Sequence, residues 1–121
     1  MSDLGEQRVD VPVGEMAYLA EVGSLVEVAP DSTVSRTVLK AEGVRLVLFS
    51  FGAGQELSEH TAAMPVLLQV FDGRLSVTAA GRRVELAAGG LVHLPARLPH
   101  SVLALAPSRL LLTMLDPRAR T

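Results

Sequence analysis

Apolar residues occur along most of this chain in short runs, and Gly or Pro interrupts each run before a helix could complete three turns. Runs of this length, recurring roughly every 8–12 residues, are typical of β-strands in sandwiches and barrels. The pattern therefore predicts an all-β domain. Its expected strands cover residues 24–28, 35–40, 44–51, 57–62, 66–72, 74–80, 82–86, 90–94, 101–106 and 109–115.

The beginning of the chain lacks this rhythm. Residues 16–22 could form a short helix, although the segment spans barely two turns. A chain of 121 residues has the length of one hydrophobic core rather than two. We therefore expect an N-terminal arm at residues 1–20, one barrel domain at residues 21–117 and a C-terminal tail at residues 118–121.

Several expected strands are apolar on both faces, most clearly residues 47–51, 66–71 and 109–115. In a barrel one face of a strand meets the core, so the other face also needs cover. An isologous interface between two copies is a natural cover, and we expect a homodimer. The alternative is that a few Leu side chains are simply exposed, as they are in most proteins.

Composition narrows the class of function. Aromatic residues are 3% of the chain and the formal net charge is -2, which disfavours a nucleic-acid partner. The absence of Cys excludes disulfides, thiolate metal sites and a Cys nucleophile. No apolar run reaches the roughly 18 residues of a membrane helix, and no signal-peptide core is evident. We expect a soluble cytoplasmic protein without a membrane partner.

Two segments combine a strand–turn–strand pattern with a histidine. Gly73 follows Asp72 in a turn dipeptide where a positive φ is expected, and Pro95 should end a strand because it has no N–H to donate. The residues that define the segments are Gly54, His60 and Gly73 in the first, and Gly89, Pro95 and His100 in the second.

In this order and spacing, the two segments resemble the signature motifs of the cupin superfamily, and the resemblance covers about residues 35–115. It implies a double-stranded β-helix, or jelly-roll barrel, with a ligand cavity inside. Typical members of the superfamily hold a divalent metal through three His and one Glu. The resemblance places His60 and His100 at two of these four positions.

The other motif positions depart from the family pattern. Ala62 stands where a second His is usual, Val66 replaces the Glu, Arg97 replaces a Gly, and Ala104 replaces an Asn. The candidates for a further metal donor are Gln69, Glu56 and Glu59. Gln69 has the wrong parity relative to residue 66 in a regular strand, and the two Glu side chains are expected at the barrel mouth.

The histidines leave two interpretations open. Either His60 and His100 are metal ligands, for Fe, Mn, Ni or Zn, or they are hydrogen-bonded residues of a metal-free cavity. If His60 points inward, residue 62 should do so as well, because strand side chains alternate. His93 is expected at the surface or in a satisfied polar contact.

Three functions follow from these alternatives. The first is a small-molecule-binding barrel anchored by the two histidines, with Arg97 at its rim. The second is a metal-dependent cupin enzyme of the dioxygenase, isomerase or decarboxylase type. The third is a structural or partner-binding dimer without a functional cavity. For the first, the expected apolar lining consists of Ala62, Val66, Leu68, Val102 and Ala104.

Overall fold

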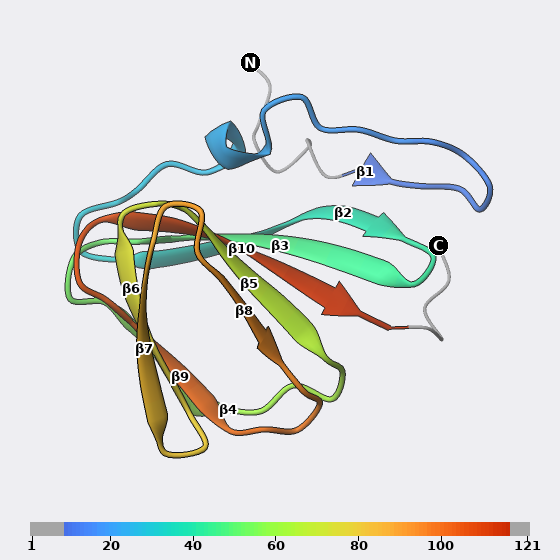
Figure 1. The fold of residues 1–121 in the computed structure, drawn as a ribbon. Coiled ribbons are helices and arrows are strands. Elements are labelled where there is room, and N and C mark those ends of the chain that lie inside the picture. Colours follow the sequence, from blue (N-terminus) through green and yellow to red (C-terminus); the bar gives the residue numbers. More distant parts are fainter. Residues whose placement is uncertain (1–8, 117–121) are drawn as a thin grey trace.

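The computed structural model describes residues 9–116 and consists of two facing β-sheets (Figure 1). The order in the larger sheet is β1-β2-β3-β10-β5-β8, and in the smaller sheet β4-β9-β6-β7. Only the β1–β2 pair is parallel in these sheets. The elements are β1 (Val9–Asp10), the 3-10 helix η2 (Val22–Leu25), β2 (Thr33–Ala41), β3 (Val44–Phe51), β4 (Glu56–His60), β5 (Val66–Asp72), β6 (Arg74–Ala79), β7 (Arg82–Ala87), β8 (Leu91–Leu94), β9 (His100–Ala104) and β10 (Ser108–Leu115).

Most predicted strands are confirmed, and the strands at residues 44–51 and 66–72 have the expected bounds. Gly73 has the expected positive φ of 92°, and β8 ends immediately before Pro95. No helix among the described residues is long and apolar enough to cross a bilayer. Residues 1–8 of the predicted arm and the whole tail at 118–121 lie outside the described range.

The prediction was wrong for residues 24–28, which do not form a strand. The only helix among the described residues is η2 at Val22–Leu25, later in the chain than the helix expected at residues 16–22. The carbonyls here bond to side chains of the sheet rather than to another strand. Leu25 accepts a hydrogen bond from Arg36 Nη1 at 2.6 Å, and Gly23 accepts one from Arg109 Nη1 at 3.0 Å.

The main core fills the space between the two sheets. Alternate residues of β5, β6, β9 and β10 point into it, as the period of two in a strand requires. Its fully buried members are Phe51, Val66, Leu68, Val70, Leu75, Val77, Leu94, Val102, Ala104 and Leu110. This core determines which side of each strand faces the barrel interior.

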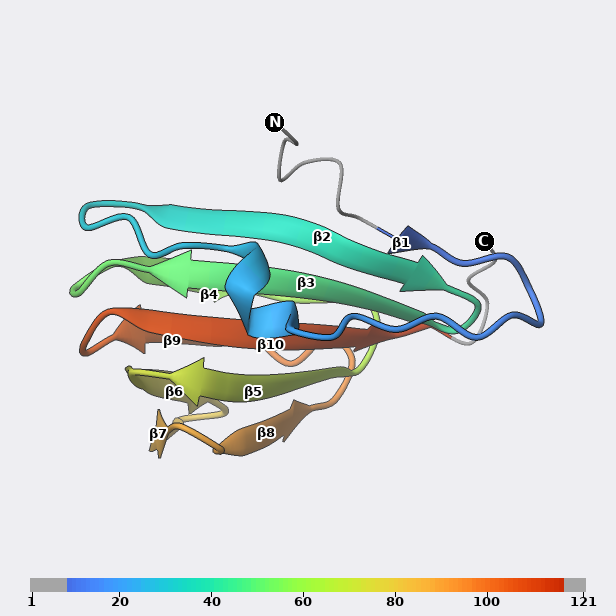
Figure 2. The same cartoon turned by 90° about the horizontal axis from the view of Figure 1, so that it is seen from above.

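A second, smaller core lies on the outer face of the larger sheet. Val38 and Leu48 of the sheet are fully buried there beneath Val26, with Leu19 and Val22 packed beside them. The N-terminal segment therefore covers the outer face, as Figures 1 and 2 show. This is the cover that we had expected from a second subunit. The homodimer itself stays a prediction.

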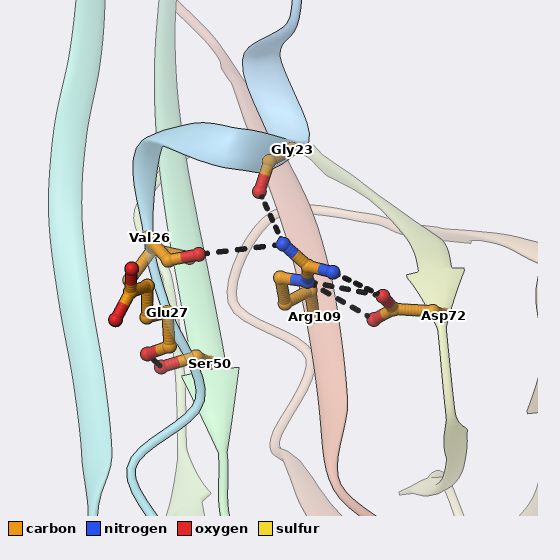
Figure 3. Close-up of polar contacts among 6 residues, drawn as sticks. All are labelled: Gly23, Val26, Glu27, Ser50, Asp72 and Arg109. Carbon is orange, nitrogen blue, oxygen red and sulfur yellow. Dashed lines mark hydrogen bonds and ion pairs between the residues drawn. The ribbon is translucent and has the colours of Figure 1, made fainter.

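Arg109 on β10 connects this N-terminal segment to the sheet (Figure 3). Its guanidinium pairs with the Asp72 carboxylate at 2.7 Å and also donates to the carbonyls of Gly23 and Val26. The hydrogen bond that Arg109 donates to Asp72 raises the pKa of Arg109 further above its usual range. Close by, the buried Ser50 hydroxyl donates to the Glu27 carbonyl at 2.9 Å.

We predict that Arg109→Met lowers the free energy of unfolding by about 1–2 kcal/mol, because it removes a charged donor to three acceptor groups. A group whose pKa is raised stabilises the fold at every pH below its unfolded pKa, so this loss should not change from neutral to mildly alkaline pH. Urea denaturation at several pH values measures it.

The matched control is Arg74→Met, because Arg74 pairs with Glu85 at 3.3 Å while both side chains are more than half exposed. An exposed pair of this kind contributes about 0–1 kcal/mol. Equal losses in the two variants would contradict a special role for Arg109.

Candidate functional site

One row of residues crosses the inner face of the smaller sheet at the end that carries both motif histidines. The register pairs His60 with His100, His100 with Ala79, and Ala79 with Arg82. Directly opposed residues in antiparallel strands share a face, so these four side chains lie on one face. We call them the inner row. The next rows toward the other end are apolar, with Leu57, Val102, Val77 and Val84 in the first of them.

A β-bulge in β4 brings His60 onto this face. Leu57 pairs with Val102 and His60 pairs with His100, so β4 has one more residue than β9 between the two pairs. Simple alternation from Leu57 would have turned Glu59 inward and His60 outward. The extra residue reverses this parity.

The strand ends at His60, so the alternation argument for residue 62 does not apply. Ala62 lies in the following loop and packs, partly buried, against the main core. Its carbonyl accepts a hydrogen bond from the Arg97 N–H at 2.7 Å. Ala62 therefore contacts the core because of the conformation of the loop, and not because side chains alternate along a strand.

The two imidazole rings lie edge to face, with their centroids 4.3 Å apart. Nδ1 of His60 lies 2.7 Å from the Ser58 carbonyl, and Nδ1 of His100 lies 2.9 Å from the Leu98 carbonyl. Because a carbonyl oxygen can only accept, each Nδ1 carries the hydrogen. In the neutral rings, each Nε2 then has a free lone pair. His100 is buried and His60 is exposed, so the pair extends from the interior to the rim.

A cavity of about 490 Å³ begins next to this pair. It lies between β6 and β7 of the smaller sheet and β8 of the larger sheet, and β7 and β8 are the edge strands of their sheets. Figure 2 shows these two strands on the same side of the molecule. The residues that line the cavity are Val77, Ala79, Ala80, Arg82, Val84, Leu86, Leu91, Val92, His93, Leu94 and Leu98.

The cavity lining differs from the lining expected from the sequence. Val66, Leu68, Val102 and Ala104 are packed in the main core and are not among the cavity residues. His60 and His100 do not line it either, but Ala79, directly opposite His100, does. His93 is exposed, as expected, and it also borders the cavity.

Sequence reasoning expected a strand that begins at Arg82 and Arg83, but it missed Arg82 as a site residue. They begin β7, and the register places Arg82 on the inner face. The turn residues are Ala80 and Gly81, which both have positive φ. The position of Arg82 directly opposite Ala79 in the β6–β7 hairpin indicates that both side chains lie on the same face of the sheet. Which face that is becomes known only once the neighbouring strand of β6 is known.

The donors present do not fit the metal site of a typical cupin. Gln69 points outward on β5, as its parity predicted, and Glu56 and Glu59 are exposed. Within residues 9–116, no group of three or more His, Cys, Asp or Glu side chains comes close enough to hold a metal ion. Two imidazoles remain, and Val66, at the motif position of the Glu ligand, is buried in the core.

Comparison with solved structures supports the fold. A conserved protein of unknown function from Streptococcus pyogenes is 25% identical, with a TM-score of 0.76 over 87% of this chain and 92% of that one. A cupin superfamily protein from Desulfitobacterium hafniense is 21% identical, with a TM-score of 0.74 over 84% and 93% of the two chains. An RmlC-like cupin from Desulfovibrio desulfuricans is 25% identical, with a TM-score of 0.69 over 84% and 95%.

No protein-family model and no curated protein matches the sequence. The class of protein is nevertheless clear from the two sheets and the structures that share them: a double-stranded β-helix barrel. Together with the two motif segments, this similarity supports the cupin superfamily for the chain, whose metal-ligand motifs are incomplete.

Arg97 occupies a motif position where glycine is usual, and its backbone shows why. Its φ is 68°, in the left-handed region that favours glycine. The exposed side chain makes no hydrogen bond or ion pair with another residue of the described range. The backbone conformation, rather than a side-chain contact, is what the position requires.

We predict that Arg97→Gly raises the free energy of unfolding by about 0.5–1 kcal/mol, since relief of the left-handed strain exceeds the added freedom of glycine in the unfolded chain. Thermal or urea denaturation measures the gain. Arg97→Ala is the control, because alanine keeps the Cβ atom and hence the strain. A similar gain in both variants would show that the arginine side chain, and not the backbone, carries the cost.

Proposed function

We propose that this protein binds a small organic molecule inside its barrel, with His60 and His100 as polar anchors beside an apolar cavity. The observation that carries the proposal is the inner row, in which His100 directly adjoins the cavity residue Ala79. The cavity volume of about 490 Å³ lies within the usual range of ligand sites, about 300–1,000 Å³.

The geometry of the histidines supports binding. Each Nδ1 is bonded to a carbonyl of its own chain segment, which fixes the ring and leaves Nε2 for a ligand. In the neutral form Nε2 accepts a hydrogen bond from a hydroxyl or amide, and in the protonated form it donates to an anion. Pockets that combine an apolar wall with a few fixed polar groups are typical of small-molecule sites.

The second candidate is a metal-dependent enzyme, which one observation favours. The two rings lie 4.3 Å apart between centroids, and both Nε2 atoms are available. Such a site would need further donors from outside the described residues or from the ligand itself. The third candidate, a dimer without a functional cavity, is disfavoured because the cavity is large enough for a ligand.

The first test is an NMR screen of small polar fragments against methyl-labelled protein. We predict that fragments that bind shift the methyl signals of Val77, Val84 and Leu86. His60→Ala should weaken binding of the hits roughly three- to ten-fold, because one ligand hydrogen bond is lost. Glu59→Ala is the control, since Glu59 adjoins His60 on the exposed part of β4. Unperturbed cavity methyls throughout the library would remove the proposal.

Elemental analysis separates binding from metal-dependent catalysis. We predict that the purified protein contains well below one Fe, Mn, Ni or Zn ion per chain.

We also predict that a double variant, Ala62→His with Val66→Glu, takes up metal. Without metal, the double variant should be strongly destabilised, because Val66 is 1% exposed and a carboxylate there is buried. Ala62→His alone is the control. The metal-dependent enzyme would instead be favoured by one result: stoichiometric metal that survives dialysis and is lost in a His60→Ala, His100→Ala double variant.

A further inference from the structure

The two adjacent arginines of β7 lie on opposite faces of the smaller sheet. Arg83 lies on the outer face, where its Nε donates to Ser76 Oγ at 2.8 Å and its guanidinium is 3.6 Å from the Glu85 carboxylate. Arg74 pairs with the same carboxylate at 3.3 Å. The outer arginines of this hairpin are therefore matched by a carboxylate and a hydroxyl.

Arg82 has no such partner among the described residues, and its side chain is exposed. It lies on the inner face opposite Ala79 and lines the cavity. Its guanidinium makes no hydrogen bond or ion pair with any residue between 9 and 116. A cationic group that borders a cavity without a counter-charge is available to a ligand.

The remainder of the cavity wall is suited to the body of such a ligand. The described lining residues include no Asp or Glu, and apart from Arg82 the only ionisable one is His93, on β8 at the opposite side of the cavity. The others are aliphatic side chains. An apolar wall with one guanidinium favours a molecule with an apolar body and one anionic group over a neutral polyol or a cation.

We propose that the ligand is a small organic monocarboxylate with a short or branched aliphatic body. The inference rests on the proposed function and assigns its ligand class. The planar guanidinium of Arg82 binds the carboxylate through two parallel N–H donors. The aliphatic body packs against Val84 and Leu86. Ala79, with only a methyl group, lies between Arg82 and His100 in the inner row.

The test compares isocaproate with its neutral amide, isocaproamide, which has the same shape. Binding is followed by NMR through the methyl signals of Val77, Val84 and Leu86. The acid should bind at least about ten-fold more tightly than the amide. Arg82→Gln should abolish this preference without changing amide binding, and added salt should weaken binding of the acid alone. Arg83→Gln, the neighbouring arginine on the other face, should leave all affinities unchanged.

The outcomes separate this inference from the proposed function. Equal affinity for acid and amide, or an unchanged acid affinity in Arg82→Gln, would overturn the carboxylate ligand and leave small-molecule binding intact. The same holds if neither probe shifts the cavity methyls while neutral fragments do. If neither the probes nor any fragment shifts them in the unmodified protein, both the ligand class and the proposed function are wrong.

Discussion

Consecutive side chains of β10 belong to two different cores. Leu110 is buried between the sheets, whereas Leu111 packs on the outer face of the larger sheet. The outer face needs cover of its own, and the segment around Val22 and Val26 provides it. Arg109 holds this segment through the carbonyls of Gly23 and Val26 while it pairs with Asp72 on the neighbouring strand. The inner face of the larger sheet is thereby free to form one wall of the barrel.

The strands could be predicted because their evidence is local. Residues 44–51 and 66–72 are rich in β-branched and aromatic side chains and end at turn residues, so their bounds follow from the sequence. Residues 22–25 could not be assigned in this way. The carbonyls of Leu25 and Gly23 accept hydrogen bonds from the side chains of Arg36 and Arg109, which lie elsewhere in the chain. Nothing in the sequence near η2 indicates these donors.

The candidate site was predictable in its histidines and not in its cavity. The family motifs indicated that His60 and His100 converge, although the β4 bulge that orients His60 was not foreseen. The cavity depends on which strands form the sheet edges and on the register of β6 with β7, both of which are tertiary properties. This is why Arg82 was not recognised as a cavity residue, and why Val102 was expected to line a cavity although it packs in the core.

Arg82 lies on an edge strand, and charged side chains on edge strands also prevent unwanted pairing between molecules. Protection of an edge strand requires a charged side chain near the strand, but this side chain can lie on either face of the sheet. Arg83 meets this requirement on the outer face, where Ser76 and Glu85 hold its guanidinium in place. Protection of the edge therefore accounts for a basic residue at the start of β7. It does not by itself account for a second, exposed arginine that borders an aliphatic cavity and has no partner within residues 9–116. Arg82, the inner arginine, is therefore the residue of this hairpin on which the proposed carboxylate ligand depends.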